Sequence, residues 1–409
     1  MTGTPISDRS FWARSAAERA ATWTELRERE PVSFQPSPSL GARPSGAGFW
    51  AVTRLEDVQL VSRTPEVFCS GQGVGLSEVP QDLLELNASF LVMDAPRHTD
   101  LRKVVSSAFT LRQVARLEND IAEQANRFVD AFVQSGGGDV VQDLAMKLPL
   151  WTISHMLGIP ESLQQELYTA AEMEIASQDP EYASTPQEAG ALAVKAAQTL
   201  HRLAGEMVAA RRREPTDDIW GTVVRSTFEG EPLSDALLGG IFVLFATAAN
   251  DTTRNTTSHA IKAFADNPAQ WALLKNDPTL INTAVEEMVR WASPVIHFRR
   301  TALQDTELAG IPIYKGDAVV VFYESANRDA TVFDNPFAFD ITRDPNPHVG
   351  FGGGGPHFCL GANLARAQLR AVFSRLAERV DAIGIGQPDF LASNFINGIK
   401  RMPVTVTPR

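Results

Sequence analysis

Apolar residues recur at helical spacing through most of the chain. From residue 94 onwards they fall at positions i, i+3 and i+4, the pattern of helices with one buried face. Short runs rich in β-branched residues near both ends indicate strands. The predicted helices include residues 99–109, 111–135, 163–176 and 186–213, and the predicted strands are residues 49–53, 306–314, 318–322 and 402–407.

The order of these elements predicts one mainly α domain, spanning residues 1–409, with a smaller β-rich portion. No charged or proline-rich linker divides the chain. We expect the β-rich portion to come from about residues 49–70, 299–322 and 391–409, and the helical portion from about residues 94–298 and 359–380.

Composition narrows the class of protein. The 409 residues are 44% hydrophobic and 21% charged, which excludes a disordered or fibrous chain. The net charge of −12 argues against a nucleic-acid partner, since phosphate binding needs a basic face. Two cysteines make no disulfide framework, and the longest apolar run, residues 237–249, is shorter than the ~20 residues of a membrane span. We therefore expect a cytoplasmic protein without a signal peptide or a membrane anchor.

A long helix with a polar interruption is predicted between Ser234 and Pro268. A helix over residues 235–266 would be about 48 Å long. Its first half is small or apolar on every side, which indicates burial. The sequence NDTT at residues 250–253 then places poor helix formers in its middle. Two interpretations stay open: a functional site, or threonine hydroxyls that bond the i−4 carbonyl and bend the helix.

Glu287 and Arg290 stand three residues apart in a predicted helix that ends before Pro294. At this spacing their side chains share a helix face. A solvated surface pair is the usual interpretation, but the apolar flanking residues favour a buried pair, which requires further hydrogen-bonding partners. The candidates to complete such a network are Arg299, Arg300, Arg328 and Arg343.

A glycine-rich loop, HVGFGGGGPHFCLGA at residues 348–362, precedes a predicted helix over residues 363–380. No Lys-Ser or Lys-Thr pair follows the glycines, so the loop does not match a phosphate cradle. His357 and Cys359 lack two further ligands for zinc. A thiol at a helix start is favoured as thiolate, which suits axial ligation of a haem iron, whereas Cys69 has no such setting.

Together these motifs resemble the cytochrome P450 superfamily, the haem-thiolate monooxygenases, over about residues 49–408. Four segments carry the resemblance and occur in the expected order. They are DAPRHTDLR at residues 94–102, AANDT at residues 248–252, the ExxR pair Glu287 and Arg290, and the glycine-rich loop with Cys359. The resemblance implies the cytochrome P450 fold, with haem b between the long central helix and the cysteine loop.

The resemblance also implies roles for individual residues. Cys359 would ligate the iron, Asp251 and Thr252 would deliver protons to dioxygen, and Glu287 and Arg290 would be structural. Other haem contacts would come from His98, Arg102, Ala248, Arg300, Phe351, His357 and Gly361. The substrate pocket would be lined by Leu244, Phe245, Ala249, Val295, Ile296, Phe298, Phe395 and Ile396, with a further wall from residues 74–91.

Three positions depart from the family pattern. Ala249 replaces the usual glycine beside the oxygen-activating residues, and Phe351 stands eight rather than seven residues before Cys359. Ala338 occupies the place of the arginine that usually joins the ExxR pair. The third member of that network would then be Arg343 or Arg328.

The resemblance implies a monooxygenase that takes O2, a hydrophobic small molecule and external electrons. No flavin or nicotinamide motif is present, so a ferredoxin and a ferredoxin reductase are the expected electron donors to a monomeric enzyme. Such partners are usually acidic, so a local basic docking face is expected. Its candidate residues are Arg102, Lys103, Arg112, Arg366 and Arg370.

The substrate class follows from resemblance to one bacterial branch. The segments RWASPV (residues 290–295), 353–359 and SNFINGIK (residues 393–400) look like the branch that hydroxylates sterols, terpenoids and methyl-branched lipids. The alternative is a hydroxylase or epoxidase that tailors a polyketide, a macrolide or another secondary metabolite. A haem-thiolate sensor or carrier without turnover, and a peroxide-using or isomerising family member, are disfavoured by the AANDT segment.

Overall fold

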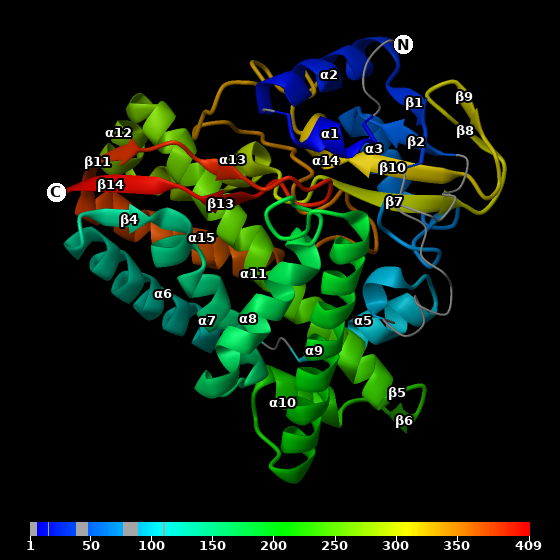
Figure 1. The fold of residues 1–409 in the computed structure, drawn as a ribbon, viewed down its shortest axis with the longest axis horizontal. Helices are drawn as coiled ribbons and strands as arrows, with labels where there is room; N and C mark the ends of the chain where they lie inside the picture. Colours follow the sequence, from blue (N-terminus) through cyan, green and yellow to red (C-terminus); the bar gives the residue numbers. More distant parts are fainter. Residues whose placement is uncertain (1–5, 15, 38–47, 77–88, 109–110) are drawn as a thin grey trace.

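Helices make up most of the molecule, and a sheet lies on the side of the N-terminus (Figure 1). The computed structural model describes residues 6–14, 16–37, 48–76, 89–108 and 111–409. The predicted class, mainly α with a smaller β portion, is confirmed. The helices are α1 (Arg9–Trp12), α2 (Ala16–Arg29), α3 (Leu55–Arg63), α5 (Arg97–Ser107), α6 (Leu111–Gln134), α7 (Lys147–Leu157), α8 (Glu161–Ala176), α9 (Pro186–Arg213), α10 (Ile219–Arg225), α11 (Asp235–Asp266), α12 (Pro268–Asn276), α13 (Ile281–Ala292), α14 (Tyr323–Ala326) and α15 (Ala362–Arg379).

The strands form two sheets and three small hairpins. The main sheet has the order β1-β2-β10-β7-β3, in which β10 is parallel to β2 and the other pairs are antiparallel. Its strands are β1 (Val32–Gln35), β2 (Phe49–Val52), β3 (Phe68–Cys69), β7 (His297–Ala302) and β10 (Ala318–Phe322). The second sheet consists of β4 (Gly137–Asp139), β11 (Val380–Ile385) and β14 (Pro403–Pro408). The hairpins pair β5 (Thr227–Phe228) with β6 (Glu231–Pro232), β8 (Thr306–Leu308) with β9 (Ile311–Ile313), and β12 (Asp389–Phe390) with β13 (Ile399–Arg401).

Two predictions about strands were wrong in detail. The strand predicted over residues 306–314 is the hairpin of β8 and β9, because Ala309 and Gly310 adopt positive φ values of 50° and 80° and turn the chain back. The C-terminal strand β14 does not join the main sheet. It pairs antiparallel with β11, the strand that follows α15 directly. This second sheet lies on the side of the molecule opposite the main sheet (Figure 1).

The central helix α11 organises the helical part. It spans Asp235–Asp266, as predicted, and the Ser234 side chain accepts the peptide N–H of Leu237 at 3.3 Å. It packs against α7, α8, α9, α13 and α15. By length and hydropathy α11 meets the criteria for a membrane span, yet 61% of its most apolar window is buried inside the protein. Burial on several sides is what a core helix requires, and it explains the apolar composition.

The end of α13 turns the chain from the helical part into the main sheet. Ser293 ends the helix in the left-handed region, with φ of 39°. Its hydroxyl donates to the carbonyl of Arg290 at 2.9 Å and accepts from the side-chain amide of Asn327 at 2.9 Å. These bonds stabilise an unfavourable backbone conformation. The turn places residues 294–298 against the cavity described next.

Candidate active site

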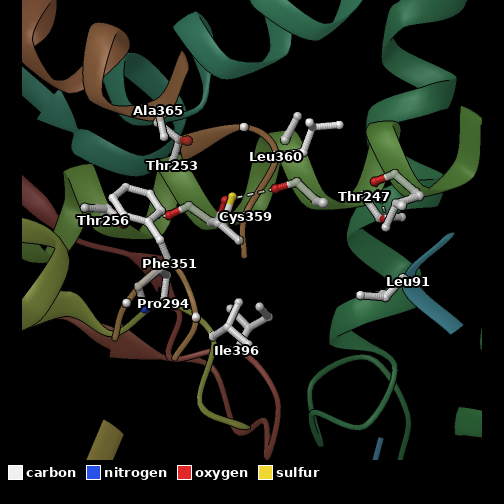
Figure 2. A pocket seen from close by; sticks show the side chains of 18 of the residues that line it. Leu91, Thr247, Thr253, Thr256, Pro294, Phe351, Cys359, Leu360, Ala365 and Ile396 are labelled. Carbon is white, nitrogen blue, oxygen red and sulfur yellow. Dashed lines mark hydrogen bonds between the residues drawn. The ribbon is translucent and has the colours of Figure 1, made fainter. Parts of the chain in front are cut away.

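A cavity of 530 Å³ lies against the middle of α11. Figure 2 shows Cys359 facing this space, with Phe351 and Ile396 to one side and Thr247 and Leu91 to the other. Seven of the eight predicted substrate-pocket residues line it: Leu244, Phe245, Ala249, Val295, Phe298, Phe395 and Ile396. The prediction for Ile296 was wrong, because its side chain is buried in the core with Trp23, Phe49 and Phe322. Of the predicted wall over residues 74–91, Phe90 and Leu91 line the cavity, and residues 77–88 lie outside the described residues.

Cys359 stands at the entry to α15. Its peptide N–H donates to the carbonyl of Phe351 at 2.9 Å, and its exposed surface lines the cavity. Burial among protein atoms raises the pKa of the thiol, although the peptide N–H of Gly361 and the charges of Arg102 and Arg366 act in the opposite direction. The peptide N–H of Gly361, at the helix start, thus acts in the direction expected from the sequence, and burial acts against it. A bound cation would also favour the thiolate.

The glycines before Cys359 permit close packing of the loop against α3. A Cβ atom on Gly353 would lie 2.4 Å from the Ser62 hydroxyl, and one on Gly355, where φ is +74°, would lie 2.1 Å from the Ser62 carbonyl oxygen. Arg63 donates to the Gly353 carbonyl at 3.2 Å. The glycines thus allow the backbone of the loop to lie close to the backbone of α3. This agrees with the exclusion of a phosphate cradle.

Four cationic or titratable side chains predicted to contact haem gather in one cluster. The rings of His98 and His357 are 4.2 Å apart between centroids, Arg102 donates to the Phe358 carbonyl, and Arg300 is 5% exposed. Burial, together with Arg300, His98 and Arg102, lowers the pKa of His357 to about 3. The buried Nε2 of His98 has no hydrogen-bond partner. Such a cluster fits an anionic ligand group.

These features fit a haem. The cysteine thiol suits an iron ligand, the cationic cluster suits the carboxylates at the haem edge, and the walls between them are largely apolar. Six of the eight residues predicted to contact haem line the cavity: Arg102, Ala248, Phe351, His357, Cys359 and Gly361. The other two, His98 and Arg300, belong to the cluster around His357 but do not line the cavity.

The ExxR residues form a buried, bidentate ion pair. Arg290 donates from Nε and Nη2 to the two carboxylate oxygens of Glu287, at 2.7 Å each, and both side chains are 0% exposed. The other N–H groups of Arg290 donate to the carbonyls of Asn327, Pro336 and Ala338 at 2.8 to 3.0 Å. All five donors of the guanidinium are thereby used, which offsets the cost of burying the charge.

The third charged member of this network is Arg343. Its Nε lies 3.3 Å from Oε2 of Glu287, which also accepts from the side-chain amide of Asn346 at 3.1 Å. Arg328 instead donates to the carbonyls of Arg290 and Trp291, at 3.0 and 2.7 Å. Of the two candidates left open by the sequence, Arg343 is therefore the one that contacts Glu287. Arg328 binds the carbonyl groups at the end of α13.

A second acid on α13 connects that helix to the cysteine loop and was missed by sequence reasoning. Glu286 accepts two bonds from Arg366 of α15, at 2.6 and 2.9 Å, and contacts His348 of the loop at 3.0 Å. The guanidinium of Arg366 lies over the Phe351 ring at 4.4 Å from its centroid. The partners of Glu286 lie 62 and 80 residues away along the chain, so no local pattern indicates them.

The polar segment of α11 divides into two faces. Thr252 lines the cavity, and its hydroxyl donates to the carbonyl of Ala248 at 2.9 Å, the i−4 bond of the structural interpretation. Asp251 is fully buried and does not belong to the cavity lining. It pairs with Arg254 at 2.8 Å, and Arg254 also contacts Glu172 at 3.2 Å. Burial raises the pKa of Asp251 to about 6 against the opposing effect of Arg254.

Several of the predicted docking cations have partners inside the protein. Arg366 pairs with Glu286, and Arg370 lies 3.9 Å from Glu118. Lys103 is exposed on α5. The side chain of Arg112 lies outside the described part of the chain.

Comparison with known proteins agrees with this geometry. Residues 270–381 match the sequence model of the cytochrome P450 family. The chain is 40% identical over 389 residues to the steroid C26-monooxygenase of Mycolicibacterium smegmatis, covering 94% of this chain and 89% of that one. It is 38% identical over 410 residues to the methyl-branched lipid omega-hydroxylase of Mycobacterium tuberculosis, covering 99% and 95%.

A solved structure is similarly close. A Mycobacterium marinum cytochrome P450 in complex with pseudoionone superposes with a TM-score of 0.93 at 47% identity, covering 99% of this chain and all of that one. The fold and these relatives define the class, and the chain belongs to the cytochrome P450 family. It is a cytochrome P450 monooxygenase, as the resemblance implied.

The buried ion pair generates the first prediction. Replacing Glu287 by alanine leaves Arg290 charged in the interior without its bidentate partner, which is expected to lower the free energy of unfolding by about 3–5 kcal/mol and to reduce haem loading. Urea denaturation and the haem content per chain measure both effects. The matched control Glu25→Ala removes an exposed partner of Arg29 and should cost less than about 1 kcal/mol. A stable, haem-loaded Glu287→Ala protein with only an altered KM would contradict the structural role.

Proposed function

We propose that this cytochrome P450 inserts one oxygen atom from O2 into a C–H bond or an alkene of a hydrophobic small molecule. The observation that carries the proposal is a single apolar cavity lined by Cys359 on one side and by Thr252 of α11 on another.

Haem b is the proposed cofactor, and bound there it would supply the reduction of dioxygen. Cys359 would hold the iron, which also offsets the raised pKa of its thiol. The buried His98 and Arg300, with Arg102 and His357, would bind the haem carboxylates. The remaining contacts with the ring would come from Ala248, Phe351 and Gly361.

The chain itself would deliver protons from α11. The Thr252 hydroxyl donates its hydrogen to a carbonyl of its own helix, so its oxygen stays available to accept a hydrogen bond from a group in the cavity. Asp251 lies next to it in sequence, and Arg254 connects Asp251 to Glu172, whose side chain is 20% exposed. Because the pKa of Asp251 is about 6, this carboxyl exchanges its proton near neutral pH. Asp251, Arg254 and Glu172 therefore offer a route from solvent.

The proposed substrates are steroids, terpenoids or methyl-branched lipids. The apolar lining supports a hydrophobic ligand. The names of the similar steroid C26-monooxygenase and methyl-branched lipid omega-hydroxylase support the same choice. We further propose a cytoplasmic, monomeric bacterial enzyme that takes electrons from a ferredoxin and its reductase. Tailoring of a polyketide or macrolide is the alternative, and a haem-thiolate protein without turnover is the more distant one.

The assignment of the ligand is tested by replacing each cysteine. Cys359→Ala should abolish the red-shifted Soret band of the ferrous carbonmonoxy form, because no other thiol lines the described part of the cavity. Cys69→Ala should keep it, since Cys69 lies buried in β3. Loss of the band from Cys69→Ala and its survival in Cys359→Ala would reverse the assignment.

The role of Thr252 is tested by Thr252→Ala. We expect normal haem and substrate binding but diversion of electrons to hydrogen peroxide, measured as product formed per NAD(P)H consumed with a surrogate ferredoxin and reductase. Thr222→Ala is the matched control, because Thr222 makes the same i−4 bond at 2.9 Å on α10, away from the cavity. Unchanged coupling in Thr252→Ala would refute the proton-delivery role. Absence of any NAD(P)H consumption with substrate in the wild type would favour the protein without turnover.

The substrate class is tested by titrating the haem-loaded protein with a steroid, a branched fatty acid and a macrolide. A hydrophobic ligand that displaces water near the iron should produce a low- to high-spin Soret shift. We expect the shift with the steroid or the branched fatty acid. A shift with the macrolide alone would support the tailoring enzyme instead.

A further inference from the structure

One carboxyl group on the cavity wall has a buried oxygen without a hydrogen-bond partner among the described residues. Glu174 lies near the end of α8, which packs against α11, and it lines the cavity together with Ser177 and Gln178. Its Oε2 is buried without a hydrogen-bond partner, and Glu174 forms no ion pair with the described residues. Glu174 is only partly exposed, and a buried carboxyl oxygen without a partner is costly, so a leucine would suit this position better in a purely structural role.

Arg254, the cation next to Asp251, is already engaged by two acids. Arg254 pairs with Asp251 at 2.8 Å and with Glu172 at 3.2 Å, and it also donates to the hydroxyl of Tyr168 at 3.1 Å. Glu174 adds a further carboxyl whose charge interacts with that of Asp251. Burial, together with the negative charge of Asp251, raises the pKa of Glu174 to about 7.

We propose that Glu174 is a specificity-determining residue that accepts a hydrogen bond from a hydroxyl group of the substrate. This inference rests on the proposed function, because it names the chemical class bound in the same cavity. An alcohol satisfies the free carboxyl oxygen while its hydrocarbon part fills the apolar walls. The hydroxyl can also accept a bond from Glu174 when that carboxyl is protonated, so an alcohol fits both protonation states.

The same reasoning predicts what the site rejects. A substrate carboxylate near Glu174 would meet the charges of Glu174 and Asp251, and Arg102, a cation of the cavity lining, lies in the cluster assigned to the haem carboxylates. An ether has no donor for an ionised carboxyl. The order expected above neutral pH is therefore alcohol over ether and alcohol over carboxylate on one hydrocarbon skeleton.

The test measures binding by calorimetry at pH 8.5, where Glu174 is ionised, with haem-loaded full-length protein. The probes are dodecan-1-ol, 1-methoxydodecane and dodecanoic acid, which share one chain length. In the wild type the alcohol should bind about tenfold more tightly than the ether and the acid, the effect of one hydrogen bond to a charged group. Glu174→Leu should reduce the alcohol-to-ether preference to about one.

Two further variants separate a specific role from a general disturbance. Glu174→Gln keeps an amide that both donates and accepts, so it should bind alcohol and ether alike while remaining folded. Glu166→Gln removes an exposed acid on the same helix, paired with Arg202, and should keep the tenfold preference. Because this readout needs no turnover, it stands apart from the test of oxygen insertion.

The proposal is overturned by any of three results: no binding of dodecan-1-ol to the wild type, equal binding of alcohol and ether, or a preference that survives Glu174→Leu. If the preference survives Glu174→Leu and the product formed per NAD(P)H also falls, the proposal is overturned and Glu174 belongs to the proton route rather than to substrate recognition.

Discussion

The buried pair of Glu287 and Arg290 is the interaction on which the site depends. Two opposite charges at 0% exposure would destabilise the fold unless every donor and acceptor found a partner. Arg290 meets this demand by binding three carbonyls of residues 327–338, so the pair holds an irregular segment that has no regular structure of its own. Asn327, one of those partners, in turn accepts the peptide N–H of Val349 at 2.8 Å, at the start of the cysteine loop. A charge pair on one helix thereby determines where Cys359 lies.

The central helix α11 places polar side chains in the core, where apolar side chains would be more stabilising. Residues 250–258 of α11 are almost all polar and almost all buried, although this is the middle of the core. Four of these side chains, Thr252, Asn255, Thr256 and Ser258, donate to i−4 carbonyls and so satisfy those donors within the helix. The side-chain amide of Asn250 is buried without a hydrogen-bond partner. The same helix therefore presents threonine hydroxyls to the cavity on one face and the Asp251–Arg254 pair to α8 on another.

The charges around the cavity are arranged with opposite signs in different regions. Cations and histidines gather where α5, β7 and the cysteine loop meet, whereas acids gather where α8 meets α11. The net charge of −12 conveys nothing of this arrangement. An amphiphilic ligand with one polar group would be oriented by it, because each region penalises one sign of charge and favours the other.

Short-range sequence patterns determined where the helices and most strands of this protein lie. Tertiary contacts decided which of them pair and which side chains meet at the site. The limits of α9 and α11 follow from the sequence, because a capping residue and a proline act within a few residues of each helix end. The motifs around Cys359 and the ExxR pair were likewise visible. Four features could not be read from the sequence, because each depends on residues distant in the chain. They are the pairing of β14 with β11, the contact of Arg343 rather than Arg328 with Glu287, the side of α11 to which the Asp251 side chain points, and the partners of Glu286. The raised pKa of Cys359 has the same origin: a helix start lies within a few residues of its thiol, but burial is set by the whole fold.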